Sequence, residues 1–523
     1  RLAFFFATNP LGAQRDGIII ANMGNEEQNW DWNGVWENAC SVDSAGWTAE
    51  IAIPFQTLRF KPDDIEVWGI NFSRIIPRKR EEAFWSPILR DYGLEGKYRV
   101  SAYGHLVGLQ GIRQPGQFEF KPFVLGGIQT NPEEGLTNAL KTSLGLDAKI
   151  HVTPNITADV TVNTDFAQVE ADQEEANLTR FELFFPEKRD FFLEGASVFR
   201  FGERSLFPLM PSSVLFFSRR IGLSDDNTLI PLLGGLKVTG KAGGVNLGFL
   251  NMTADRLAYV NDSDEQISVP RTNYGVLRIR QDIMESSSVG VIALNKQSFD
   301  DGAFNRNFGI DANFYLTPNT QIGGFIAKSY SPGVDGNNLM AYGDVSYNDD
   351  FWSFFVSQNT IQDDFAPEMG FFTRTGVRKT EVSFGIGPRP RLLNIRQLFL
   401  FTDFFYIANQ QGEVEARYGY SGIYSQFGDG SYWLGMASMN LECLTDVFEI
   451  RDGVNIQPGT YRFANVFTEY ESDKSQWLSV KLTGNIGRFY DGSIIGNGCG
   501  LNLKAGARLT WNLDYQRNAD DVT

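Results

Sequence analysis

The stretch from Leu144 to Asn163 decides the fold and reads LGLDAKIHV, then TPN, then ITADVTVN. Apolar and polar residues alternate on both sides of the Thr-Pro-Asn at 153–155. A period of two is strand geometry, because successive side chains point to opposite faces. The polar face carries charged residues on both strands, and the apolar face has no polar break. Such a hairpin is typical of a wall between lipid and water.

The same alternation recurs in 308–316, 478–483 and 501–515, and a second Thr-Pro-Asn stands at 317–319. Tight turns combined with much longer polar connections fit a transmembrane barrel, which has short turns at one rim and long loops at the other. We therefore predict an all-β chain in which residues 113–523 form an antiparallel transmembrane β-barrel of about sixteen strands. The side chains expected to face lipid are Leu144, Ile150, Val160, Phe314, Leu503 and Leu509.

Composition excludes several function classes. The 523 residues carry a net charge of -17, and nucleic acid is therefore excluded as a partner, because phosphate binding needs a basic surface. The sequence contains no run of about eighteen apolar residues, and a membrane-spanning helix is therefore excluded. The three cysteines (Cys40, Cys443 and Cys499) lack CxxC spacing, and only two histidines are present. We expect no metal site, no cofactor and no catalytic residue; calcium in the acidic loops 225–227, 261–264 and 363–364 is the alternative.

Residues 1–112 differ from the predicted barrel in sequence pattern, because their predicted strands are short and they contain six of the ten tryptophans. Short strands separated by turn residues predict a partial β-sandwich, which we place at the periplasmic mouth of the barrel. Trp30, Trp32 and Trp36 lie in a segment rich in Asn, Asp and Glu. Their rings are candidates for stacking on sugars, and core packing is the equally weighted alternative.

The predicted barrel part of the chain contains the strings NTDFAQVEAD (163–172), NLTRF (177–181), FFPEKRDFFLEG (184–195) and FSRRIG (217–222). These strings resemble a barrel domain of unknown function, the 5916 family, of bacterial outer-membrane proteins. WNGVWE (32–37), GWTAEIAIPF (46–55) and WGINFSR (68–74) resemble the second half of a family-9-type carbohydrate-binding module that precedes this barrel. The resemblance implies a bacterial outer-membrane location and a β-barrel that follows a carbohydrate-module-like domain. The sequence departs from this resemblance in two places, because the first half of the module and a closing strand that ends in an aromatic residue are not found in it. Either the sequence is a fragment, or another piece completes the barrel.

Residues 165–194 form the densest charge cluster, interleaved with Phe181, Phe184, Phe185, Phe191 and Phe192. The alternation of period two is lost here, and a solvated loop would not expose so many large apolar rings. We predict that this segment folds into the barrel and narrows the lumen, with a ligand contact as the alternative. Glycoside hydrolysis by Glu182 and Glu187 is a third hypothesis. The residues expected to form the constriction are Arg180, Glu182, Glu187, Lys188, Arg189 and Glu194.

Three functions follow. The first is a porin-like protein of the bacterial outer membrane that binds or takes up glycans. The second is a structural barrel that anchors or scaffolds a surface complex, and the third is a surface glycan hydrolase. We expect the chain not to be an enzyme. The partners expected are outer-membrane lipid, glycans, and other outer-membrane or periplasmic proteins.

Overall fold

The computed structural model is almost entirely β-structure. It describes residues 2–22, 25–30, 32, 34–58, 60, 65–79, 81–89, 96–112, 118–131, 136–153, 156–164, 177, 179–204, 213–224, 228–260, 265–284, 287–390, 392–451, 453–506 and 509–521. Among these residues, no helix is both long and apolar enough to cross a membrane.

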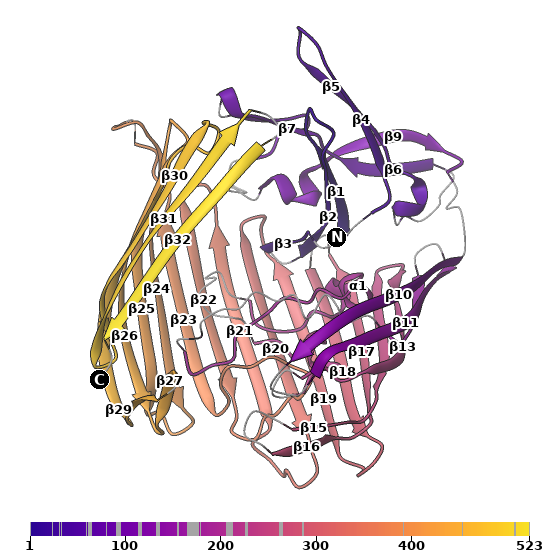
Figure 1. Cartoon of the computed structure of the whole chain (residues 1–523), viewed down its shortest axis with the longest axis vertical. Helices are drawn as coiled ribbons and strands as arrows, with labels where there is room; N and C mark the ends of the chain where they lie inside the picture. Colours follow the sequence, from indigo (N-terminus) through magenta and orange to yellow (C-terminus); the bar gives the residue numbers. More distant parts are fainter. Residues whose placement is uncertain are drawn as a thin grey trace.

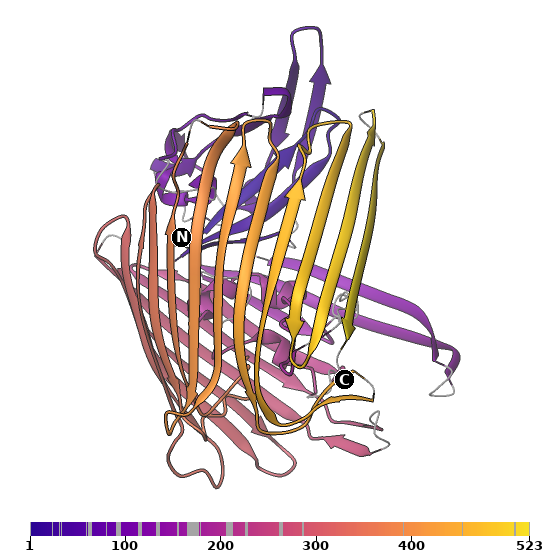
Figure 2. The ribbon, with the colours of Figure 1, turned by 90° about the vertical axis from the view of Figure 1, so that its left-hand side faces the viewer.

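One curved antiparallel sheet contains nineteen strands of the described residues, with β10 and β32 at its two ends (Figures 1 and 2). Each strand pairs with the next strand of the sheet along the chain, and no described ladder joins β10 to β32. The strands are β10 (Phe118–Asn131), β11 (Leu136–Thr153), β12 (Ile156–Val162), β13 (Leu232–Ala242), β14 (Val245–Ala254), β17 (Thr272–Ile283), β18 (Ser287–Ser298), β19 (Phe304–Tyr315), β20 (Thr320–Tyr330), β21 (Leu339–Asn348), β22 (Trp352–Ile361), β23 (Val377–Ile386), β24 (Ile395–Asn409), β25 (Val414–Phe427), β26 (Tyr432–Leu444), β29 (Gly459–Glu471), β30 (Leu478–Phe489), β31 (Gly492–Ala505) and β32 (Leu509–Asp521).

The two faces of this sheet have opposite chemistry. Val291, Ile310 and Ile326 lie in register on three neighbouring strands and are 44%, 66% and 58% exposed. On β19, Asn307 and Asp311 lie on the opposite face from Ile310 and are buried on the concave side. An apolar outer face and a polar inner face are the arrangement of an outer-membrane β-barrel. The predicted fold class is therefore confirmed.

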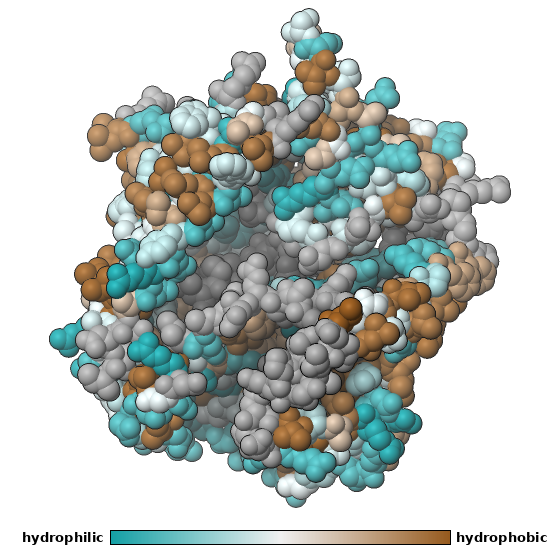
Figure 3. Space-filling model, viewed as in Figure 1, coloured by the Kyte–Doolittle hydropathy of each residue, from teal (hydrophilic) through white to brown (hydrophobic). Residues whose placement is uncertain are grey.

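The six side chains predicted to face lipid all lie on this outer face. Leu144 and Leu509 are exposed, and the other four (Ile150, Val160, Phe314 and Leu503) are half-buried. Each of these four alternates along its strand with residues of the inner face. Hydrophobic side chains gather on the outside over β10 and β11 at the right of the space-filling view (Figure 3).

Nineteen strands exceed the roughly sixteen predicted from alternating segments. The reason is visible on β14 and β17, where Leu250, Met252 and Val276 face inward and are buried in a hydrophobic core. Their outward neighbours Phe249 and Leu277 are apolar too. A strand that is apolar on both faces loses its period of two, and pattern counting overlooks it.

The two rims differ as predicted. Short connections such as 243–244, 316–319 and 349–351 lie at one rim. Long ones, including 163–231 and 362–376, lie at the other. Two of the long loops carry small hairpins, β15 (Leu257–Val260) with β16 (Gln266–Val269) and β27 (Phe448–Arg451) with β28 (Val454–Ile456).

The N-terminal region lies at the rim of short turns (Figures 1 and 2). Arg99 donates a hydrogen bond of 3.3 Å to the carbonyl of Pro318, in the second Thr-Pro-Asn turn. The described residues here form four small antiparallel sheets. Their strands are β1 (Leu2–Thr8), β2 (Gln14–Asn22) and β3 (Asn25–Asn29); β4 (Glu37–Val42) and β5 (Trp47–Ala52); β6 (Ile65–Ile70) and β9 (Gly104–Gln110); and β7 (Ser73–Ile76) and β8 (Glu81–Phe84).

Candidate functional site

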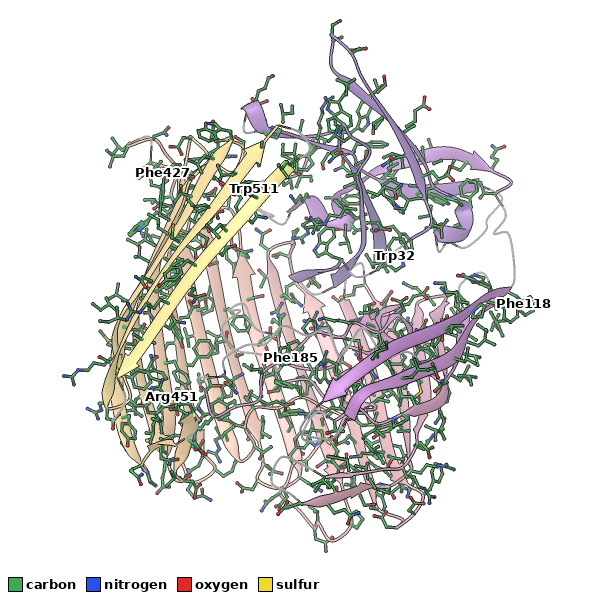
Figure 4. The ribbon with its side chains drawn as sticks, in the orientation of Figure 1. Trp32, Phe118, Phe185, Phe427, Arg451 and Trp511 are labelled. Carbon is green, nitrogen blue, oxygen red and sulfur yellow. The ribbon has the colours of Figure 1, made fainter. Side chains whose placement is uncertain are left out.

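The connection between β12 and β13 folds back into the barrel. We use the name lumen segment for its described residues 179–204, 213–224 and 228–231. Two single-turn helices, α1 (Asp190–Leu193) and α2 (Ala196–Phe199), lie within it. Figure 4 shows Phe185 of this segment inside the curved sheet. A backbone hydrogen bond of 3.1 Å from Asn163 to Leu233 brings the two ends of the connection together.

The apolar side of the lumen segment packs against the inner wall. Phe201 is buried, and its ring centroid lies 4.9 Å from that of Phe325 on β20. A Cβ added to Gly248 of β14 would come within 2.8 Å of the ring of Phe199. This position therefore requires glycine, because backbone and ring meet closely there. The lumen segment is thus part of the folded core of the barrel.

Ion pairs join the lumen segment to the wall on opposite sides. The guanidinium of Arg180 lies 3.1 Å from a carboxylate oxygen of Glu442 on β26. The carboxylate of Glu194 lies 2.7 Å from the ammonium of Lys149 on β11. These two strands lie far apart in the sheet order. The segment therefore reaches across the lumen.

The tightest contact within the segment is the pair of Arg189 and Glu187. The Arg189 side chain is 1% exposed and donates two hydrogen bonds, of 2.7 and 2.9 Å, to the Glu187 carboxylate. It also donates to the carbonyls of Ile221 at 2.7 Å and Ser218 at 2.8 Å. Bidentate pairing of this kind is geometrically specific. It fixes the first half of the segment to the second half.

Burial by itself would raise the pKa of Glu187, but the charge and hydrogen bonds of Arg189, with a hydrogen bond from Ser218, lower the pKa below its usual value. A lowered folded-state pKa stabilises the fold above the unfolded pKa, and this stability is lost as the pH falls through the folded value. We therefore expect amide hydrogen exchange in 187–221, corrected for its intrinsic pH dependence, to accelerate only below about pH 4.3. In the Glu187→Gln variant this pH dependence should be absent; its persistence would contradict the assignment.

A second set of charged contacts anchors the end of residues 179–204 of the lumen segment to the inner wall. Arg204 donates to Asp344 and Gln321 on the inner wall and, at 3.0 Å, to the hydroxyl of Ser346. Next to it, the Glu203 carboxylate lies 2.5 Å from the ammonium of Lys379 on β23. Buried charges are tolerated only when paired, and here the pairing also fixes position.

The loop 362–376 enters the lumen and completes the site. Val214 and Phe371 exchange backbone hydrogen bonds of 3.0 and 2.9 Å, and so the loop adds a short strand-like contact to the lumen segment. From the same loop, Arg374 donates to the hydroxyl of Tyr418 at 2.8 Å and to Glu442 at 3.3 Å. Glu442 therefore holds two arginines, one from the lumen segment and one from the loop.

The family model described as "Domain of unknown function (DUF5916)" matches residues 114–518. The chain belongs to this family. The match covers the barrel and confirms the resemblance predicted for that part of the sequence. The carbohydrate-module resemblance of residues 1–112 stays a prediction. None of the curated proteins matches the chain.

Among solved structures, the chain is similar to OpdK of Pseudomonas aeruginosa, determined with vanillate, at 10% identity and a TM-score of 0.34; 56% of this chain and 90% of that chain are covered. An improved structure of the same protein, there named OccK1, gives 11% identity and a TM-score of 0.33, covering 57% and 90%. A third structure, described as the outer membrane protein OpdK, gives the same identity and TM-score, covering 57% and 91%. The lipid-facing outer surface of the present chain agrees with the predicted bacterial outer-membrane location.

All six residues predicted to form the constriction lie in the lumen segment. Besides the pairs already described, Glu182 lies 2.5 Å from the guanidinium of Arg220. For Lys188, the backbone amide donates to Glu187 at 3.0 Å. The beginning of the predicted segment, 165–176, lies outside the described residues. Whether these contacts limit flow through the lumen stays a prediction.

Arg204, Arg374 and Glu442 were not predicted from the sequence. A local signal for Glu442 was present, because Ser438, Asn440 and Glu442 are polar at every second position of β26. Its partner Arg180 is separated from it by 262 positions. No local pattern could connect the two residues.

The structure corrects the proposed role of Trp36. Its side chain is only 6% exposed, and its indole nitrogen donates to Asp16 at 3.2 Å. A ring buried in this way cannot serve as a platform for a sugar. The interpretation as a core aromatic holds for this residue, because the hydrogen bond satisfies the only polar atom of the indole.

The other two tryptophans also contact protein groups. The guanidinium of Arg15 lies 4.1 Å from the ring centroid of Trp30. Trp32 lies 5.1 Å from Phe4, centroid to centroid. Both rings are half-buried, and their sugar-binding role stays a prediction.

Of the acidic loops considered for calcium, 225–227 and 261–264 lie outside the described residues. Asp363 and Asp364 lie in the loop that enters the lumen. Within the described ranges, no group of three or more His, Cys, Asp or Glu side chains is placed to hold a metal ion.

Proposed function

We propose that this protein is an outer-membrane channel in which the lumen segment forms a fixed constriction, and that glycans are the solutes it binds or takes up. The observation that carries this proposal is the pair of wall contacts, Arg180 with Glu442 and Glu194 with Lys149. They hold a charged segment across the interior of the barrel. Charged side chains that line a narrow passage set its selectivity.

The distribution of the hydrophobic core also supports a channel. Among the described residues, the wall residues of the main core come from β13 to β25, and none comes from β26, β29, β30 or β31. A second, smaller cluster, which includes Leu444 at the end of β26, lies at the long-loop end of those strands. The inner wall of those four strands carries polar residues such as Asn465, Lys481 and Thr483, which are half-buried. A passage bounded by these side chains would be wet.

Liposome swelling tests this proposal. Liposomes that contain the protein should swell in isotonic solutions of small sugars, and the rate should fall steeply as the sugar becomes longer. Protein-free liposomes provide the baseline. A rate equal to this baseline for every sugar would overturn the channel and leave the structural barrel, an anchor for other outer-membrane or periplasmic proteins. The dense packing of the lumen segment favours that second function.

We further propose that the chain is not an enzyme. Glycoside hydrolysis needs one carboxyl group that gives a proton and a second that is free to act on the sugar. Here Glu187 is held by Arg189, and Glu182 is paired with Arg220. Neither carboxylate is free for that chemistry.

A further inference from the structure

A row of aromatic side chains crosses three neighbouring strands near the rim of short turns. Phe399 lies on β24, Tyr424 on β25 and Tyr432 on β26. The ring centroids of the first two are 6.0 Å apart, and those of the second two are 5.5 Å apart. The rings are tilted by 38° and 44°. We call these three residues the aromatic row. Phe427, labelled in Figure 4, ends β25 at this rim.

The aromatic row faces the lumen. Tyr424 is separated by an even number of residues from Tyr418 on the same strand, as Tyr432 is from Glu442. Residues at even separation share a face of a strand. Tyr418 and Glu442 both accept hydrogen bonds from Arg374 inside the lumen. Tyr424 and Tyr432 therefore lie on the inner wall as well.

Polar groups flank one end of the aromatic row. The hydroxyl of Tyr432 donates a hydrogen bond of 2.5 Å to Glu469 on β29. The ammonium of Lys481 on β30 lies 3.1 Å from the same carboxylate, and the Lys481 side chain is 43% exposed. A hydroxyl, a carboxylate and an ammonium thus stand beside aromatic faces. This combination offers both donors and acceptors to a ligand.

The other end of the aromatic row opens into a cleft of about 1110 Å³. Phe399 lines this cleft together with Phe401 and Gln397 of β24. The opposite side is formed by the N-terminal region, including Glu82 and Lys97. A ligand could therefore pass from the cleft beneath the N-terminal region onto the aromatic row. Ligand sites are typically concave, mainly apolar and equipped with a few convergent polar groups.

We propose that the aromatic row is a binding site for the sugar rings of a linear, uncharged oligosaccharide entering from the short-turn rim. A pyranose ring has an apolar C–H face that fits an aromatic ring and an edge of hydroxyls that needs donors and acceptors. Several rings in a line match a chain of such units. The charges of Glu469 and Lys481 compensate each other, so this end of the row offers hydrogen bonds without a net charge, which suits an uncharged sugar. This inference deepens the proposed function. It rests on that function only for the statement that the sugar enters the barrel from the short-turn rim.

Calorimetric titration of the full chain in detergent provides the test. The probes are linear hexasaccharides of glucose, mannose, xylose and N-acetylglucosamine. At least one should bind, and Tyr424→Ala should weaken its binding about tenfold, because it removes the central ring of the row. Phe399→Leu keeps apolar volume but removes a planar face, and it should also weaken binding. Tyr432→Phe keeps the ring, loses the hydrogen bond to Glu469, and should have a smaller effect.

The matched control is Tyr470→Ala, which removes an aromatic ring from the outer face of β29 and should leave the affinity unchanged. The inference is overturned if none of the four sugars binds, or if Tyr424→Ala and Phe399→Leu bind as tightly as the unchanged protein. Liposome swelling separates this result from the proposed function. Binding without sugar entry refutes the channel alone, whereas entry without binding refutes the aromatic row alone.

Discussion

Deletion of residues 170–192 should raise the single-channel conductance several-fold in a planar bilayer while the barrel stays folded. The deletion removes the contact of Arg180 with Glu442 and the buried pair of Glu187 and Arg189. The wall does not need these residues, because β12 pairs directly with β13 from Ile156–Gly240 to Val162–Gly234. Barrel ladders carry the backbone hydrogen bonds that a membrane-spanning sheet requires. Removal of the segment should therefore widen the lumen without opening the sheet.

A loop at the same rim supplies the control for this deletion. Residues 332–336, between β20 and β21, are mostly exposed, and shortening them should leave conductance unchanged. Heat-dependent mobility on a denaturing gel reports whether each variant keeps its barrel. If the 170–192 deletion is folded and conducts like the unchanged protein, the lumen segment is not a constriction.

The second large effect concerns the buried pair. Glu187→Gln should destabilise the lumen segment by about 3–5 kcal/mol, because it leaves the charge of Arg189 buried without its counter-ion. Amide hydrogen exchange in 187–221 should then accelerate roughly a hundredfold or more, since opening of this part would cost that much less free energy. Exchange in the wall strands should change little. The effect is thus expected to be local.

Two variants sharpen this prediction. Glu187→Gln combined with Arg189→Met removes both charges and should recover part of the lost protection. Asp282→Asn breaks a pair with Lys241 at the short-turn rim, where the side chains are 40% and 50% exposed. Exposed pairs contribute about 0–1 kcal/mol, and exchange should scarcely change. Equal exchange in Glu187→Gln and the unchanged protein would mean that the pair does not hold the segment.

The sequence by itself determined the wall of this barrel. Alternation such as that of 144–163 depends only on neighbouring residues, because the backbone of a strand sends successive side chains to lipid and lumen. The same local reasoning identified the lumen segment through the loss of that period. It could also mark Glu442 as a lumen residue from its place on a polar face.

Only the tertiary structure decided what the lumen contains. The partners Arg180 and Glu442 are 262 positions apart, and the packing of Phe201 on Phe325 joins an interior segment to a distant strand. Where the lumen segment packs, the wall turns apolar inside, and the alternation that predicts strands disappears. The aromatic row likewise exists only because register brings Phe399 opposite Tyr424. Local sequence sets the face on which a side chain lies, and long-range pairing sets what it meets there.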